Sequence, residues 1–148
     1  MLALAESVEG DLRQQLIGDA LENAVAAFDG FGRESCRVWS AKATDISKAA
    51  GLSFHNLAGA QQKVRDFFGF DIASCIHSEQ WNFVCRCFQK RHLLAHSMGV
   101  VDEDYIRKTN NPQAIKGRKV SIQIDEVRNL VKVLVNLGLF LFKELEAK

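Results

Sequence analysis

The chain has 148 residues, of which 47% are apolar and 25% are charged. These proportions allow a packed globular core, and the length suits one domain that spans residues 1–148. The chain has a single proline, Pro112, and no Ser/Gly/Pro-rich linker. We therefore expect no domain boundary and no repeat or low-complexity tract inside it.

From the two ends of the sequence we expect neither a signal peptide nor a membrane span. Residues 1–12 lack the basic start and the unbroken apolar run of a signal peptide. The apolar run of residues 131–142 is too short to span a bilayer, and Lys132 and Asn136 interrupt it. We expect a cytoplasmic protein without membrane attachment.

No C-x-x-C pair is present, so buried reduced thiols are expected instead of a zinc ribbon. The cysteines are Cys36, Cys75, Cys85 and Cys87.

The net charge is only +1, but the charges are distributed unevenly. Residues 80–124 contain eight lysines and arginines and three acidic residues, whereas the rest of the chain has more acids than bases. A basic zone of this kind suits a polyanion such as nucleic acid. Chance clustering of surface charges is the alternative, and it applies more to the segment after Thr109 than to the compact group of residues 90–96.

Apolar residues at helical spacing predict the elements of the first half of the chain. A helix is expected over residues 5–27, and the glycines of residues 29–32 should end or bend it. A second helical piece should cover residues 33–43, followed by a polar connector over residues 44–51. A further helix should begin at an N-cap, Ser53, and end near a glycine-containing break.

The second half is predicted to hold a central helix, a short helix and a long last helix. Ser78 should cap the central helix, which ends before Gly99. A short helix over residues 102–109, a loop with Pro112 and an extended segment over residues 119–124 should follow. The last helix is apolar on more than one face, so it lies deep in the fold or binds a second subunit. The predicted fold class is all-α, an antiparallel bundle of four to five helices.

The central helix ends in a cluster of Lys90, Arg91, His92 and His96, for which three interpretations are open. The first is a metal site, because His92 and His96 lie about 40° apart on a helix. Leu93 replaces the glutamate of the zinc-protease motif, and Lys90 and Arg91 would repel a cation, so no metal is expected. The second is structural, since basic residues near a helix C-terminus complement its dipole.

The third interpretation is chemistry on RNA. Cleavage without a metal requires a base for the 2′-hydroxyl, an acid for the leaving oxygen and a cation for the phosphorane charge. Arg91 offers a fixed cation, and His96 offers a group that titrates near neutral pH. The two residues are about 140° apart around a helix, so they cannot point the same way. Two copies paired across a two-fold axis would remove this difficulty, so a homodimer belongs to the hypothesis.

The segment Arg91–His96, RHLLAH, fits the R-x-x-x-x-H motif of the HEPN superfamily of small α-helical domains. Residues 99–109 also resemble the continuation found in bacterial branches of this superfamily, and the order of the helices is similar. The resemblance in residues covers Trp81–Thr109. It implies a homodimeric helical bundle that acts on RNA and needs no cofactor.

Many HEPN proteins are metal-independent endoribonucleases of toxin–antitoxin, abortive-infection and other anti-phage systems. On this pattern Arg91 and His96 are the catalytic pair: His96 acts as general acid or base, and Arg91 stabilises the transition state. The product would carry a 2′,3′-cyclic phosphate. His92 corresponds to the polar position that orients the phosphate, and Lys90 and Arg86 are expected to bind RNA phosphates. An antitoxin or a partner domain is a possible further partner.

One position departs from the pattern of HEPN toxins that pair with a nucleotidyltransferase antitoxin. Those toxins have a tyrosine two residues after the histidine, where this chain has Met98. The resemblance therefore does not extend to regulation through that tyrosine. The alternative function is a non-catalytic RNA- or nucleotide-binding or dimerisation module of a larger assembly.

Overall fold

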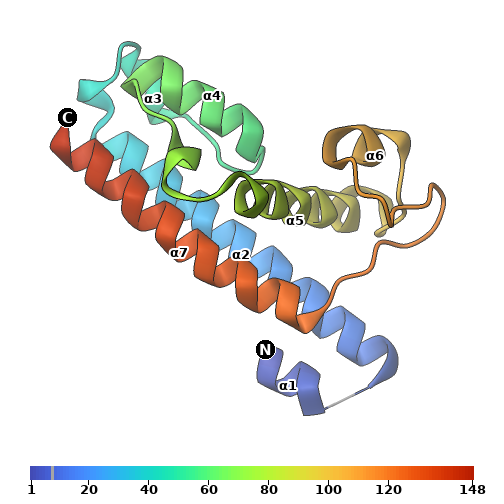
Figure 1. Cartoon of the computed structure of the whole chain (residues 1–148). Helices are drawn as coiled ribbons and strands as arrows, with labels where there is room; N and C mark the ends of the chain where they lie inside the picture. Colours follow the sequence, from blue (N-terminus) through green and yellow to red (C-terminus); the bar gives the residue numbers. More distant parts are fainter. Residues whose placement is uncertain (8) are drawn as a thin grey trace. The chain divides into compact units, whose positions relative to one another are not determined.

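A computed structural model describes residues 1–7 and 9–148, and its helices confirm the all-α class (Figure 1). The described residues form no strand, and none of their helices is long and apolar enough to cross a membrane. Val8, inside the helix predicted over residues 5–27, lies outside the described residues. The α-helices are α1 (Leu2–Ser7), α2 (Gly10–Val38), α3 (Ile46–Ala50), α4 (Leu57–Phe68), α5 (Ser78–Ser97), α6 (Glu103–Thr109) and α7 (Ile124–Ala147), with 3-10 turns at Ser40–Lys42 and Ile72–Cys75.

The described chain divides into two compact units. Unit 1 consists of Met1–Val25 and Asn82–Val131, and unit 2 of Ala26–Trp81 and Lys132–Lys148. The cluster that ends the central helix lies wholly in unit 1, because α5 enters this unit at Asn82.

Unit 1 has its core where α2, α5 and α7 bury their apolar faces. Ile17 and Leu21 of α2, Phe88 of α5 and Leu130 of α7 are almost fully buried. A satellite core of Leu93, Val101 and Tyr105 joins the end of α5 to α6. Leu12, an apolar residue in the first turn of α2, is 55% exposed and lies outside this core.

The connection from α5 to α7 is held by backbone pairing. Gly99, at φ +80°, ends the helix and donates its N–H to the Leu93 carbonyl. Val100 then forms an isolated antiparallel bridge with Lys119, so the predicted extended segment pairs only at its start. Across the same loop the Val101 N–H donates to the Arg118 carbonyl, and the Gly117 N–H donates to the Val101 carbonyl. Asp102 caps α6 by accepting the Tyr105 N–H. These bonds place α6 beside the end of α5.

Unit 2 shows why the glycines of residues 29–32 do not end α2. Gly32 lies against the ring of Phe54, where a Cβ atom would come within 2.6 Å of Cδ2. The glycine therefore serves close packing inside a continuous helix, and the predicted break is wrong. Buried Asp29 accepts hydrogen bonds from the Phe54 N–H and the Ser53 hydroxyl, which ties residues 53–54 to α2.

Two caps in unit 2 also differ from the predicted ones. The predicted connector over residues 44–51 contains α3, whose N-cap is Asp45. The next helix, α4, begins after Asn56, whose side chain accepts the Gly59 N–H, and not at Ser53, which is bonded to Asp29. Gly69 ends α4 in the left-handed conformation, as a helix C-terminus favours.

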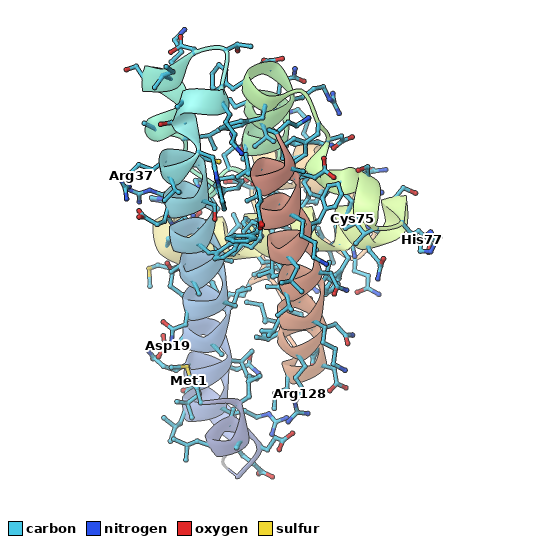
Figure 2. The ribbon with its side chains drawn as sticks, turned by 90° about the vertical axis from the view of Figure 1, so that its left-hand side faces the viewer. Met1, Asp19, Arg37, Cys75, His77 and Arg128 are labelled. Carbon is cyan, nitrogen blue, oxygen red and sulfur yellow. The ribbon has the colours of Figure 1, made fainter. Side chains whose placement is uncertain are left out.

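In each unit α2 and α7 run side by side in the same direction, as both views show (Figures 1 and 2). This pair departs from the predicted antiparallel arrangement. The two helices are not consecutive, since in unit 1 α5, α6 and residues 110–123 come between them in the chain. A long connection permits a parallel pair, whereas a short helix–helix loop imposes an antiparallel one.

Candidate functional site at the end of α5

The predicted cluster separates because its side chains leave α5 in different directions. Successive residues on a helix point about 100° apart. Lys90, Arg91 and Leu93 are buried, whereas His92 and His96 are exposed. The described structure thus divides the four titratable residues into two buried cations and two exposed imidazoles.

Lys90 is only 6% exposed and makes two strong contacts. Its ammonium donates to the Ser121 carbonyl oxygen and to Oε2 of Glu126, each at 2.7 Å. Glu126 lies in the first turn of α7, so this ion pair connects α5 to the start of that helix. Lys90 is therefore placed to hold unit 1 together, and its charge does not reach the surface.

Arg91 is also buried and faces α2. Its Nη1 lies 3.6 Å from Oε1 of Glu22, and its Nε is buried without a hydrogen-bond partner in the described structure. Glu22 was not among the residues that the sequence predicted for the site. No local pattern could have identified it, because it lies about 70 residues earlier on another helix.

His92 and His96 lie one helical turn apart on the exposed side of α5. Their ring centroids are 4.5 Å apart with an interplanar angle of 50°. Desolvation lowers the pKa of His92, and His96, Arg91 and Lys108 lower it further, while Asp102 opposes the shift. His92 is therefore mostly neutral at neutral pH and can accept a proton.

Arg86 is half-buried, and its Nε, like that of Arg91, is buried without a hydrogen-bond partner in the described structure. The other cations of the predicted basic zone lie in and after α6. Arg107 and Lys108 both contact Asp104, and Lys116 contacts Glu103. Several charges that the sequence counts as a basic zone are thus neutralised by neighbouring acids.

A cleft of about 750 Å³ lies on the α2 side of the end of α5. Its lining includes Asp11, Asp19 and Glu22 from α2, Leu94 and Met98 at the end of α5, and a single cation, Lys119. This acidic lining would repel a phosphate. His92 and His96 do not line the cleft, so their exposed face is the better candidate for a polyanion.

The four cysteines behave as ordinary thiols and take no part in this cluster. Burial raises the pKa of Cys36 and Cys87 to about 12 and that of Cys85 to about 11. Cys75 is exposed, contrary to the expectation that all four are buried, because it lies in the turn before α5. No disulfide pairs any of them.

Comparisons with family models, with curated proteins and with solved structures returned no match. Within residues 1–7 and 9–148, no group of three or more His, Cys, Asp or Glu side chains is arranged to hold a metal ion. The function is therefore inferred from the chemistry of α5 and its neighbours.

Proposed function

We propose that this protein is a metal-independent endoribonuclease of the HEPN type, with a composite site at a homodimer interface. The observation that carries the proposal is the exposed imidazole pair His92–His96, which directly follows Arg91 on α5. Of these two imidazoles, which lie 4.5 Å apart, one can exchange protons with RNA while the other orients the phosphate. The R-x-x-x-x-H spacing of Arg91 and His96 also supports the proposal, because it resembles the motif of known HEPN ribonucleases.

The chemistry follows from the two protonation states of an imidazole. A neutral imidazole removes the proton of the 2′-hydroxyl, whose oxygen attacks the adjacent phosphorus atom. A protonated imidazole then gives its proton to the leaving 5′-oxygen, and the product is a 2′,3′-cyclic phosphate. We assign His96 to general acid–base catalysis. His92, whose pKa is lowered, is the neutral group beside it and orients the phosphate.

The composite site is supported by the directions in which Arg91 and His96 leave α5. Arg91 is buried against Glu22, whereas His96 is exposed, as expected for residues about 140° apart. A phosphate held by His96 of one copy would need the guanidinium of another copy to stabilise its charge. Forming that site requires Arg91 to exchange Glu22 for the phosphate when RNA binds.

The proposed set of phosphate-binding residues is smaller than the sequence suggested. Lys90 is buried and paired with Glu126, so we assign it to the stability of unit 1. Arg86 is half-buried. Arg118 is exposed in the loop that pairs with residues 99–101, and it is the better candidate for a contact with an RNA phosphate.

The biological setting that the resemblance suggests is toxin or anti-phage defence, or RNA processing, in the cytoplasm. An antitoxin or a partner domain would then control the enzyme. These assignments depend on the ribonuclease activity and are tested after it.

The deciding experiment compares wild-type protein with His96→Ala on total RNA in EDTA. His77→Ala is the matched control, because His77 is also exposed but precedes α5 and projects outward from unit 2 (Figure 2). We expect wild type and His77→Ala to release fragments with 2′,3′-cyclic phosphate ends. His96→Ala should fold normally by circular dichroism and cleave about 10²- to 10⁴-fold more slowly. Cleavage by His96→Ala at the wild-type rate would contradict the proposal.

A non-catalytic RNA- or nucleotide-binding or dimerisation module is the second candidate. The ion pair of Arg91 with Glu22 favours it, because a neutralised guanidinium does not stabilise a phosphorane. This candidate predicts RNA binding that weakens steeply with salt and yields no product, even with wild-type protein.

A further inference from the structure

The pair His92–His96 has a second chemical property, which does not depend on RNA. Two neutral imidazoles one turn apart on a helix can each direct a ring nitrogen at the same ion. Their centroids are 4.5 Å apart, and both side chains are exposed and free to rotate. One ring nitrogen of each histidine can therefore lie about 2.0–2.1 Å from the same ion.

One objection to a metal site is that Lys90 and Arg91 would repel a cation. Their contacts weaken this objection. The Lys90 ammonium is buried between the Ser121 carbonyl and Glu126, and Arg91 faces Glu22 on another side of α5. Each cation is therefore paired with its own acid, although the charge of Arg91 still lowers the pKa of His92.

The charged groups near α6 that act on His92 have opposite signs. Lys108 and Asp102 both act on His92, and Lys108 has the larger effect. The Lys108 ammonium lies 3.0 Å from Oδ2 of Asp104, which offsets part of its charge. Asp102 is exposed and uses Oδ1 to cap α6.

We propose that His92 and His96 form a two-histidine site for a divalent transition-metal ion, for which Zn²⁺ is the probe. Imidazole suits Zn²⁺, Cu²⁺ and Ni²⁺, whereas Mg²⁺ and Ca²⁺ prefer oxygen ligands. Water completes the coordination of the ion. The site is open and exposed, as a regulatory site is, whereas structural zinc sites are closed by four protein ligands.

Metal binding would have a defined consequence for the chemistry proposed above. An ion on His92 and His96 occupies the lone pairs that would accept a proton, so Zn²⁺ would inhibit RNA cleavage. This consequence rests on the proposed function. The binding itself does not, and it is measured without RNA.

The test is calorimetric titration of the full chain with Zn²⁺, at a pH about one unit above the ordinary histidine pKa. Besides wild type, the variants are His92→Ala, His96→Ala and two controls. His77→Ala removes an exposed histidine outside the pair, and Cys75→Ser removes the exposed thiol. We expect His92→Ala and His96→Ala each to weaken binding by about tenfold or more, the order of loss that even an outer-shell change causes. The controls should bind like wild type.

A spacing variant keeps the number of histidines constant. In His96→Ala combined with Ser97→His, the two imidazoles are five residues apart, about 140° around α5, and cannot share an ion. This variant should bind Zn²⁺ as weakly as His92→Ala. Wild-type affinity in the spacing variant, in His92→Ala or in His96→Ala would overturn the proposal. So would a wild-type chain that does not bind Zn²⁺, or one whose binding is lost in Cys75→Ser.

Discussion

Lys90 and Arg91 are neighbouring cations in the sequence, but each is neutralised by a different helix. Lys90 reaches Glu126 at the start of α7, and Arg91 reaches Glu22 in the middle of α2. Burying a cation is unfavourable unless an acid or a carbonyl oxygen compensates it, and Lys90 has both. At the residue scale, then, the same cluster contains groups with structural roles and groups available for chemistry.

Replacing Lys90 tests the structural role assigned to it. Lys90→Ala leaves Glu126 without its partner, and because the Glu126 side chain is 26% exposed, the loss of stability should be about 2–3 kcal/mol. The measurement is the urea concentration at half unfolding. Lys116→Ala is the control, since Lys116 forms an exposed pair with Glu103 and its loss should leave the midpoint unchanged. If Lys90→Ala keeps wild-type stability but binds RNA more weakly, Lys90 contacts RNA and its structural role is wrong.

At the scale of the element, α2 continues through two glycines that a sequence pattern associates with a helix end. Gly32 is buried against Phe54, and Gly30 is exposed with no atom within 4 Å of the position of a Cβ. Phe54 itself is fully buried and stacks edge-to-face on Phe28. Gly32 thus lets residue 54 approach the helix, whereas Gly30 has no packing role.

The two glycines therefore respond in opposite ways to the same substitution. Gly32→Ala puts a methyl group into the ring of Phe54 and should destabilise the protein by about 1–3 kcal/mol. Gly30→Ala adds helix propensity without a clash and should stabilise it by about 0.5–1 kcal/mol. Denaturant unfolding measures both. Equal effects of the two substitutions would show that Phe54 does not pack on Gly32.

At the scale of the whole molecule, the proposed homodimer needs a surface that excludes water. On the part of α7 in unit 2, Val135, Leu139 and Phe142 are all at least 39% exposed and lie within about 60° of one another around the helix. Phe142 also contacts Trp39 and Phe31 of the same unit. A continuous exposed apolar stripe of this kind is typical of a surface that binds another chain.

A charge in the middle of this stripe tests the dimer. We expect the wild-type chain to elute with twice its mass of 16.5 kDa by light scattering. Leu139→Glu should weaken association by about tenfold or more and shift the protein toward the monomer, because a carboxylate would be desolvated in the interface. Asn136→Glu adds the same charge at an exposed position outside the stripe and should leave the mass unchanged. A wild-type monomer would contradict both the dimer and the composite site.

The all-α class and most helix positions follow from the amino-acid sequence alone. Helical spacing of apolar residues and local caps act within a few residues of chain, so Ser78, Gly99 and Asp102 mark element ends close to those observed. The same local reasoning located the cluster at the end of α5 and the one-turn spacing of His92 and His96, because the pitch of a helix sets both.

The exposure of these residues and the contacts that each one makes depend on the folded chain. The partners of Lys90 and Arg91, Glu126 and Glu22, are 36 and 69 positions away in sequence, and no local pattern predicts them. The role of Gly32 likewise depends on Phe54, and the parallel course of α2 and α7 within each unit depends on the path of the intervening chain. Burial and ion pairing are properties of contacts between distant segments, which is why the cluster divided into structural cations and exposed imidazoles only in the folded chain.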